Sequence, residues 1–160
     1  MTYGLQGVSP HMSRQIELKT NAQMAKMHEA GLILHQGLDA VVAAAKPGVT
    51  TKDLDQVFRK VLADNGATSN FLGYYGFPAT ICASVNDEVV HGIPGDRVLQ
   101  DGDIISVDAG AIIDGWHSDS ARTVFVGDVT PEDQRLSAIT EDAMWAGIAA
   151  YATAKHVGEI

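Results

Sequence analysis

DIISVDAGAIIDGWHSDSARTVFV, residues 103–126, is the segment from which the architecture of this chain follows. It is rich in Val, Ile, Thr and aromatic residues, and the pair Asp114-Gly115 interrupts it near its middle. Asp-Gly between two strand-like runs is a strong hairpin signal, because a type I′ turn needs positive φ at both central residues. The sequence therefore predicts two antiparallel strands joined by a two-residue loop.

That loop sets the register of the two strands and brings two acidic residues together. With Ile113 opposite Trp116, counting outward places Ala121 opposite Asp108. Asp119 is then the diagonal neighbour of Asp108 on the same face of the hairpin. Diagonal neighbours lie roughly 7–8 Å apart at the backbone, so both carboxylates can reach a pair of metal ions about 3.5–4 Å apart.

The two faces of the predicted hairpin differ in polarity. The residues that alternate with Asp108 on the first strand form an apolar row for the core: Ile105, Val107, Ala109, Ala111 and Ile113. The returning strand places on the polar face His117, Asp119, Ala121 and Thr123. Small residues at positions 110 and 121 leave room beside the carboxylates, as in the floor of a pocket.

Two alternatives to a metal site remain open on these residues alone. A β-bulge in either strand would shift the register and send Asp108 and Asp119 to opposite faces. The pair could equally lie on a solvated face, since antiparallel sheets often expose one side to water. If the aspartates bind metal, their oxygen atoms favour magnesium or manganese, and an added imidazole would bring iron, cobalt or zinc into range.

Helix signals flank this β-rich region on both sides. Apolar spacing predicts a first helix from a cap at Thr20 or Asn21 to about Ala45, with the buried face Met24, Met27, Gly31, Leu34, Leu38 and Val41. A second is expected from about Thr51 to Asn65-Gly66, with Leu54, Val57, Phe58, Val61 and Leu62 on one side. A third should run from Thr130 to about Lys155, turning toward the sheet Leu136, Ile139, Ala143 and Ile148. With further strands at Ala79–Val85 and Val89–His91, the expected fold class is one α+β unit.

Composition excludes several classes of partner. The chain has 160 residues, 46% of them hydrophobic, and 20 acidic against 11 basic residues give a formal net charge of −9. This charge opposes sequence-independent binding to nucleic acid or to anionic lipid. No stretch approaches the roughly 20 apolar residues of a membrane span, and the first residues lack an apolar signal core. A cytoplasmic protein is expected, which agrees with the single cysteine, Cys82.

The central sequence also resembles a known enzyme family. FPATICASVNDEVVHGIPGDRVLQDGDIISVDAGAIIDGWHSDSARTVFVG, residues 77–127, is similar to the signature region of the type I methionine aminopeptidases of metallopeptidase family M24. The similarity continues through KPGVTTKDLDQ, residues 46–56, back to about residue 16. It implies the amino-terminal half of a pita-bread fold over residues 16–160, an antiparallel sheet with helices packed on one face. Residues 1–15 lack periodicity and include a second possible start, Met12, so a flexible amino-terminal arm is expected there.

The resemblance implies a role for individual residues. Asp108 would ligate one ion of a dinuclear site, and Asp119 would bridge two divalent ions drawn from cobalt, manganese, iron or zinc. His91 would hydrogen-bond the substrate near the scissile amide. The alternative is that His91 is a loop histidine with a purely structural role. The methionine side chain would be held by Tyr74, Phe77 and Cys82, whose alternative role is ordinary core packing. The counterpart of His117 is not a metal ligand in the family.

The function implied by the resemblance is removal of the initiator methionine from nascent proteins by metal-dependent hydrolysis. The expected partners are N-terminal methionyl peptides, with possible proximity to the ribosome. The remaining family ligands should follow the last helix and are absent from these 160 residues, so this chain by itself is predicted to be inactive. Two alternatives are a proline-specific peptidase of the same fold, against which the HGIPGD context argues, and a non-catalytic peptide-binding module.

Overall fold

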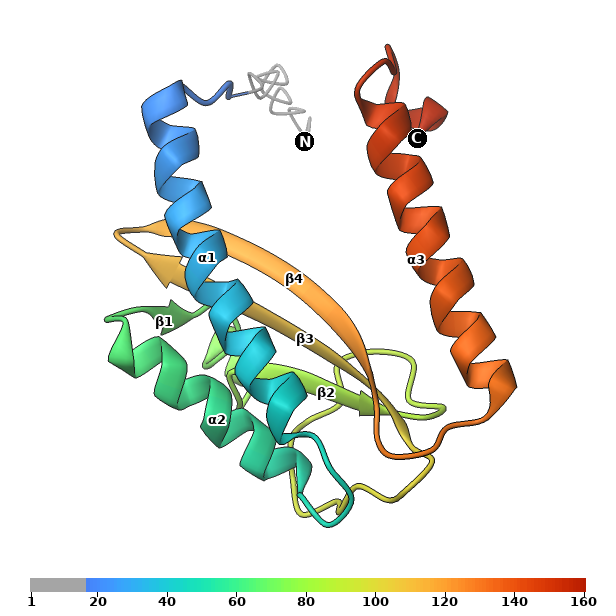
Figure 1. Cartoon of the computed structure of the whole chain (residues 1–160). Coiled ribbons are helices and arrows are strands. Elements are labelled where there is room, and N and C mark those ends of the chain that lie inside the picture. Colours follow the sequence, from blue (N-terminus) through green and yellow to red (C-terminus); the bar gives the residue numbers. More distant parts are fainter. Residues whose placement is uncertain (1–16) are drawn as a thin grey trace, which may run out of the picture.

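The structure is a computed structural model that describes residues 17–160; the arm predicted for residues 1–15 lies outside them. Three α-helices, four strands and two 3-10 turns make up the described part (Figure 1). In chain order they are α1 (Asn21–Ala44), α2 (Thr51–Asp64), β1 (Thr68–Ser69), η1 (Tyr74–Gly76), β2 (Ile81–Val85), β3 (Ile104–Ile113), β4 (Trp116–Phe125), α3 (Pro131–Tyr151) and η2 (Val157–Glu159). Among these helices, none combines the length and apolar character needed to cross a bilayer.

Strand β3 organises the antiparallel sheet. β4 pairs along the whole of one edge of β3. Along the other edge, β1 pairs with Ala111 and Ile112, and β2 pairs with residues 105–109. Gly110 therefore faces the break between β1 and β2, and the chain leaves the sheet at that point in a loop of residues 70–80.

The predicted hairpin is confirmed in its turn and its register. Asp114 and Gly115 have φ of 50° and 78°, as a type I′ turn requires. Ile113 pairs with Trp116, and Asp108 pairs with Ala121. No bulge intervenes, so Asp119 pairs with Gly110 and lies diagonally from Asp108, on the same face.

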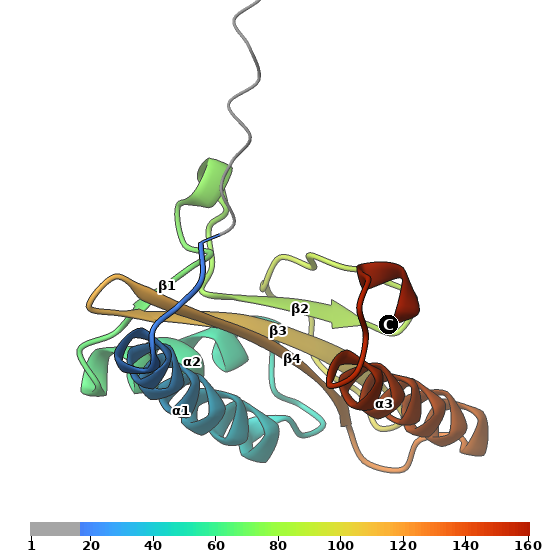
Figure 2. The same ribbon diagram turned by 90° about the horizontal axis from the view of Figure 1, so that it is seen from above.

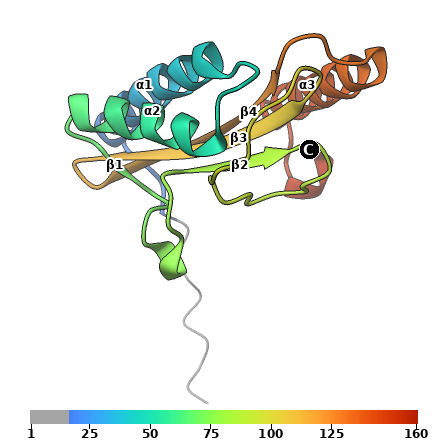
Figure 3. The ribbon, with the colours of Figure 1, turned by 90° about the horizontal axis from the view of Figure 1, so that it is seen from below.

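The two faces of the sheet have different surroundings. The apolar row of β3 is fully buried from Ile105 to Ala111, beneath α1 and α2 (Figures 2 and 3). Within residues 17–160, no α-helix covers the opposite face, and there the loop that contains η1 projects away from the sheet (Figures 2 and 3). The α+β class with helices packed on one face is thus confirmed, and both carboxylates belong to the uncovered face.

Helices α1 and α2 begin at reciprocal caps. Thr20 and Thr50 each accept a hydrogen bond from the backbone N–H of the third helical residue, whose side chain in turn accepts one from the backbone N–H of the cap. α2 buries Leu54, Phe58 and Leu62 as predicted. The prediction for α1 is wrong over its first two turns, because Met24 and Met27 are exposed. The buried face of α1 begins only where the helix crosses the sheet, and it consists of Ala30, Ile33, Leu34, Gly37, Leu38 and Val41.

Two further predictions are corrected by the structure. Helix α3 forms where expected but buries no residue, so its predicted apolar face does not pack on the sheet. A cleft of about 440 Å³ lies between it and β4, lined on the helix side by Ser137, Thr140, Glu141 and Met144. The segment Val89–His91 is not a strand: it is exposed, with no sheet partner to fix it. Residues with high β-propensity form a strand only where a neighbouring strand offers hydrogen-bond partners.

Candidate metal centre

A cavity of about 690 Å³ opens on the uncovered face of the sheet. All six residues that the sequence analysis selected contribute to its wall: Tyr74, Phe77, Cys82, His91, Asp108 and Asp119. Five more line it that the analysis did not assign to the site: Asn70, Phe71, Tyr75, Ile93 and His117. Residues from the hairpin, from strand β2 and from two separate loops therefore meet in one place.

The two carboxylates lie at the floor of this cavity. Asp108 is half-buried and Asp119 is exposed. Burial raises the pKa of Asp108 first and the charge of Asp119 raises it further, while His91 and the Ala109 N–H act in the opposite direction. Among the described residues neither carboxylate forms an ion pair with a Lys or Arg. Two like charges side by side, without a Lys or Arg partner among these residues, form a site that favours a cation.

Cys82 also lies at the cavity floor, on strand β2, which pairs with the edge of β3 opposite to β4. It pairs with Asp108 in the ladder between β2 and β3 and is buried. Burial, followed by the charges of Asp108 and Asp119, raises the pKa of the thiol to about 11. At neutral pH this cysteine is therefore a protonated, apolar-like group, which suits a wall that contacts a thioether or an aliphatic chain.

His91 is brought to the cavity by the loop that follows β2. Its φ is 58°, and the next residue, Gly92, accepts a hydrogen bond from Ala83 N at 2.9 Å and donates one to Ser84 Oγ at 3.0 Å. A Cβ at position 92 would lie 2.4 Å from the Ala83 carbonyl oxygen. Only glycine allows this segment to lie so close to β2, and that contact carries His91 to the neighbourhood of Asp108.

The aromatic loop, residues 70–80, forms another wall. Its course depends on positive φ at Gly73, Tyr75 and Gly76. The rings of Phe71 and Phe77 meet edge to face at a centroid distance of 6.4 Å. All four aromatic residues of the loop line the cavity, with Phe71 and Phe77 partly buried and Tyr74 and Tyr75 exposed at its rim.

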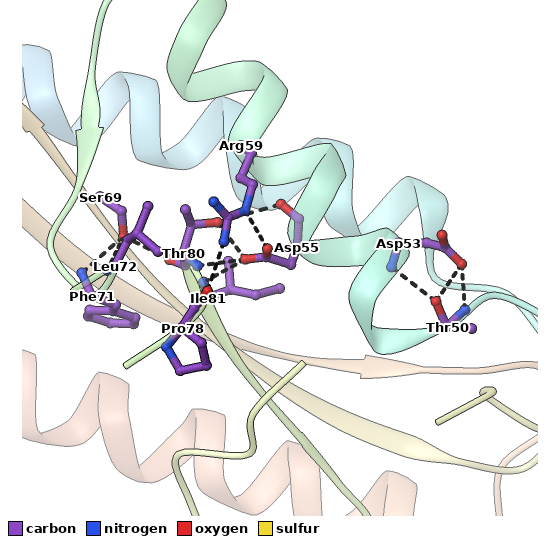
Figure 4. A network of polar contacts seen from close by, with 10 residues as sticks. All are labelled: Thr50, Asp53, Asp55, Arg59, Ser69, Phe71, Leu72, Pro78, Thr80 and Ile81. Carbon is purple, nitrogen blue, oxygen red and sulfur yellow. Dashed lines mark hydrogen bonds and ion pairs between the residues drawn. The ribbon is translucent and has the colours of Figure 1, made fainter. Parts of the chain in front are cut away.

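A polar network ties the end of this loop to α2 (Figure 4). Asp55, only 5% exposed, accepts hydrogen bonds at Oδ1 from the backbone N–H and the hydroxyl of Thr80, both at 2.6 Å. Arg59 donates to Asp55 Oδ2 at 2.6 Å and to the Pro78 carbonyl at 3.1 Å. Ser69 Oγ donates to the Thr80 carbonyl at 3.1 Å, which joins the two ends of the loop. The cavity wall is thereby fixed to the helical layer.

The residues that sequence reasoning missed are of three kinds. The parity of the hairpin places His117 on the correct face, and only the family resemblance argues against it as a ligand. Phe71, Tyr75 and Ile93 lie within three residues of a predicted site residue, so proximity along the chain is an available signal. Asn70 had no such signal, because it reaches the cavity only through the break between β1 and β2.

The donor atoms present fit part of a divalent metal site. Carboxylate oxygens suit hard divalent cations, and a cation between Asp108 and Asp119 would relieve their repulsion. No group of three or more His, Cys, Asp or Glu side chains within residues 17–160 is arranged to hold a metal ion. Among the described residues, the cavity therefore offers a cation two carboxylates, those of Asp108 and Asp119.

Comparisons with known proteins show which family and fold this chain shares. A methionine aminopeptidase 1 from Mycobacterium tuberculosis is 42% identical over 92% of this chain and 56% of its own length. The crystal structure of a methionine aminopeptidase from Rickettsia prowazekii has a TM-score of 0.82 and 40% identity, covering 84% of this chain and 54% of that one. An Xaa-Pro dipeptidase from Bacillus anthracis shares the fold, with a TM-score of 0.71 and 24% identity over 81% of this chain and 35% of that one.

Two facts follow from these comparisons. The chain spans about half the length of the curated relatives it matches. The similarity also extends over all three α-helices and the sheet, well beyond the hairpin, because the family match covers residues 25–160. The chain belongs to metallopeptidase family M24.

Proposed function

We propose that this chain is part of a metalloaminopeptidase that removes the N-terminal methionine from polypeptides. One observation carries the proposal: Asp108 and Asp119 lie diagonally on the open face of one hairpin, with no Lys or Arg ion-pair partner among the described residues, at the floor of a cavity with aromatic walls. Its similarity to methionine aminopeptidases at about 40% identity supports the choice of substrate. Because the relatives are nearly twice as long, the activity is proposed for a site that this chain forms in part.

Asp108 and Asp119 are the proposed metal ligands of this chain. When bound, two divalent ions supply Lewis acidity and hold the reacting groups in place. The carboxylates keep the ions on the open face of β3 and β4, where a peptide has access from solvent. The ions proposed are cobalt, manganese, iron or zinc, as in the family: the two carboxylates alone favour manganese, and an imidazole ligand would bring the other three into range.

The remaining site residues bind and orient the peptide in this proposal. His91 donates a hydrogen bond to the substrate near the scissile amide, from a loop that stands at the rim of the cavity. Tyr74, Phe77 and Cys82 surround the methionine side chain, because aromatic rings and a protonated thiol make favourable contacts with a thioether. In this proposal the protein is located in the cytoplasm and works near the ribosome, where new N-termini emerge.

Metal titration tests the ligand assignment. Co²⁺ titrated into the chain should give a visible absorption band, and Asp108→Asn and Asp119→Asn should each weaken binding by at least tenfold, since losing even a group that only orients a ligand costs about 10–100-fold. Asp142→Asn on α3 makes the same chemical change at an exposed position away from the cavity and should bind Co²⁺ like the parent. Equal affinity in all four proteins would refute the assignment.

Peptide specificity tests the substrate. The metal-loaded chain, alone and supplemented with the part of the M. tuberculosis relative that it does not match, is assayed on Met-Ala-Ser and on Ala-Pro. We expect no turnover by the chain alone and methionine release by the supplemented protein, abolished by Asp119→Asn. Preferential cleavage of Ala-Pro would instead identify a proline-specific peptidase, which shares this fold.

A further inference from the structure

Asn70 occupies an unusual place in the cavity wall. β1 ends at Ser69, opposite Ala111, and β2 begins opposite Ala109, so Asn70 leaves the sheet beside Gly110. A Cβ built on Gly110 would lie 2.7 Å from Asn70 Cγ and 2.8 Å from Asn70 Nδ2. The Asn70 amide therefore lies directly over Gly110, on the face of β3 that also carries Asp108.

From this position the Asn70 side chain reaches across β3 to the next strand. Its Nδ2 donates a hydrogen bond to the Ser118 carbonyl of β4 at 3.2 Å. Ser118 immediately precedes Asp119, and Asp119 pairs with Gly110 in the ladder. The amide thus links the start of the aromatic loop to the backbone that carries one of the two carboxylates.

The other end of the amide has no partner. Among the described residues, Asn70 Oδ1 is the one buried side-chain polar atom without a hydrogen bond. An unpaired buried oxygen destabilises a fold, and native proteins contain few of them. Because the hydrogen bond to Ser118 fixes which end of the amide is the donor, the orientation that leaves Oδ1 unpaired is set by the structure. Stability alone does not account for an asparagine here.

We propose that Asn70 is a positioning residue for Asp119. Its amide holds β4 at Ser118, so that the Asp119 carboxylate stays beside Asp108 at the separation that a shared cation needs. The inference rests on the proposed metal site and deepens it. Gly110 is also required for this role, because any side chain at position 110 would displace the Asn70 amide.

A positioning role and a purely structural role predict different outcomes for Asn70→Ala. Removing the amide abolishes the tie to Ser118 and also removes the unpaired oxygen. We therefore expect Co²⁺ or Mn²⁺ affinity to fall about tenfold, the lower end for groups that orient a ligand, while the midpoint of urea unfolding stays unchanged or rises. Loss of stability with unchanged metal affinity would mean that Asn70 serves the fold alone, and would overturn the proposal.

Asn65→Ala is the matched control. Asn65 also donates its Nδ2 to a backbone carbonyl, that of Val61 at 2.9 Å, but at the end of α2, outside the cavity lining. This variant should bind Co²⁺ like the parent. If Asn65→Ala weakens binding as much as Asn70→Ala, the effect is not local to the site and the proposal fails.

A second pair of variants tests the contact with Gly110. Gly110→Ala should displace Asn70 and weaken metal binding more than Asn70→Ala does, and the double variant should recover to the affinity of Asn70→Ala. Additive losses would show that the two residues act independently and would overturn the pairing. Failure of the proposed function is a separate result: the parent would then bind Co²⁺ no better than Asp108→Asn.

Discussion

Helices α2 and α3 start alike and end up in different surroundings. Each follows a threonine cap, Thr50 or Thr130, whose hydroxyl accepts a hydrogen bond from an aspartate N–H three residues on. α2 then buries Leu54, Phe58 and Leu62 against α1 and the sheet, whereas α3 buries none of its residues and stands apart from both other helices (Figure 1). Local signals set where a helix begins, but they carry no information about what it packs against.

The polar contacts of the two helices differ in the same way. α2 reaches the sheet through Asp55 and Arg59, which bind the backbone at Thr80 and Pro78. The side-chain hydrogen bonds of α3 in the described chain stay within the helix and the two residues before it, Val129 and Thr130. α2 is therefore part of the structure that supports the cavity, and the stability of this chain should depend on α2 far more than on α3.

The largest expected effect concerns the apolar contact of α2. Phe58 is fully buried, and its ring lies against Gly37 of α1 so closely that a Cβ there would approach within 2.4 Å. Phe58→Ala should lower the free energy of unfolding by about 3–5 kcal/mol, from lost burial and a cavity. Ile139→Ala on α3 should change it by less than about 0.5 kcal/mol. Urea denaturation followed by circular dichroism measures both, and similar losses would show that α3 packs as α2 does.

The second largest loss of stability is expected from the hydrogen bonds of Asp55. Asp55→Ala leaves the N–H groups of Thr80 and Ile81 without their acceptor, which should cost about 2–3 kcal/mol. Hydrogen exchange at these two amides should become faster, together with exchange in the aromatic loop. Asp142→Ala, an exposed aspartate on α3, is the control and should leave both unchanged. Unaltered exchange at Thr80 in Asp55→Ala would mean that the network does not hold the loop.

The smallest effect gives the sharpest contrast, since the same substitution is made in both helices. Thr50→Ala should destabilise the chain by about 1 kcal/mol through loss of the helix cap. Thr130→Ala removes an equivalent cap but should change global unfolding by less than about 0.5 kcal/mol, because an unpacked helix opens on its own. Instead, amide exchange should accelerate within α3. Equal shifts in the unfolding midpoint would place α3 in the same cooperative unit as α2.

The hairpin shows how far local reasoning reaches. Asp114-Gly115 determined the turn, the turn determined the register, and the register put Asp108 and Asp119 on one face, all without knowledge of the rest of the chain. The pocket residues Tyr74, Phe77 and Cys82 required the family resemblance, because no spacing rule connects an irregular loop to a strand. Their roles, like that of His91, remain predictions.

What the sequence by itself determined was local: the helix caps, the two-residue turn and the alternation of apolar and polar residues along β3. The tertiary structure decided which apolar faces found a partner. It left Met24 and Met27 exposed and α3 without a buried residue. It also broke the edge of the sheet at Gly110, so that Asn70 could lie over the glycine. Turns and caps depend on the conformational limits of a few adjacent residues, whereas burial and the meeting of distant side chains depend on where the whole chain places its surfaces.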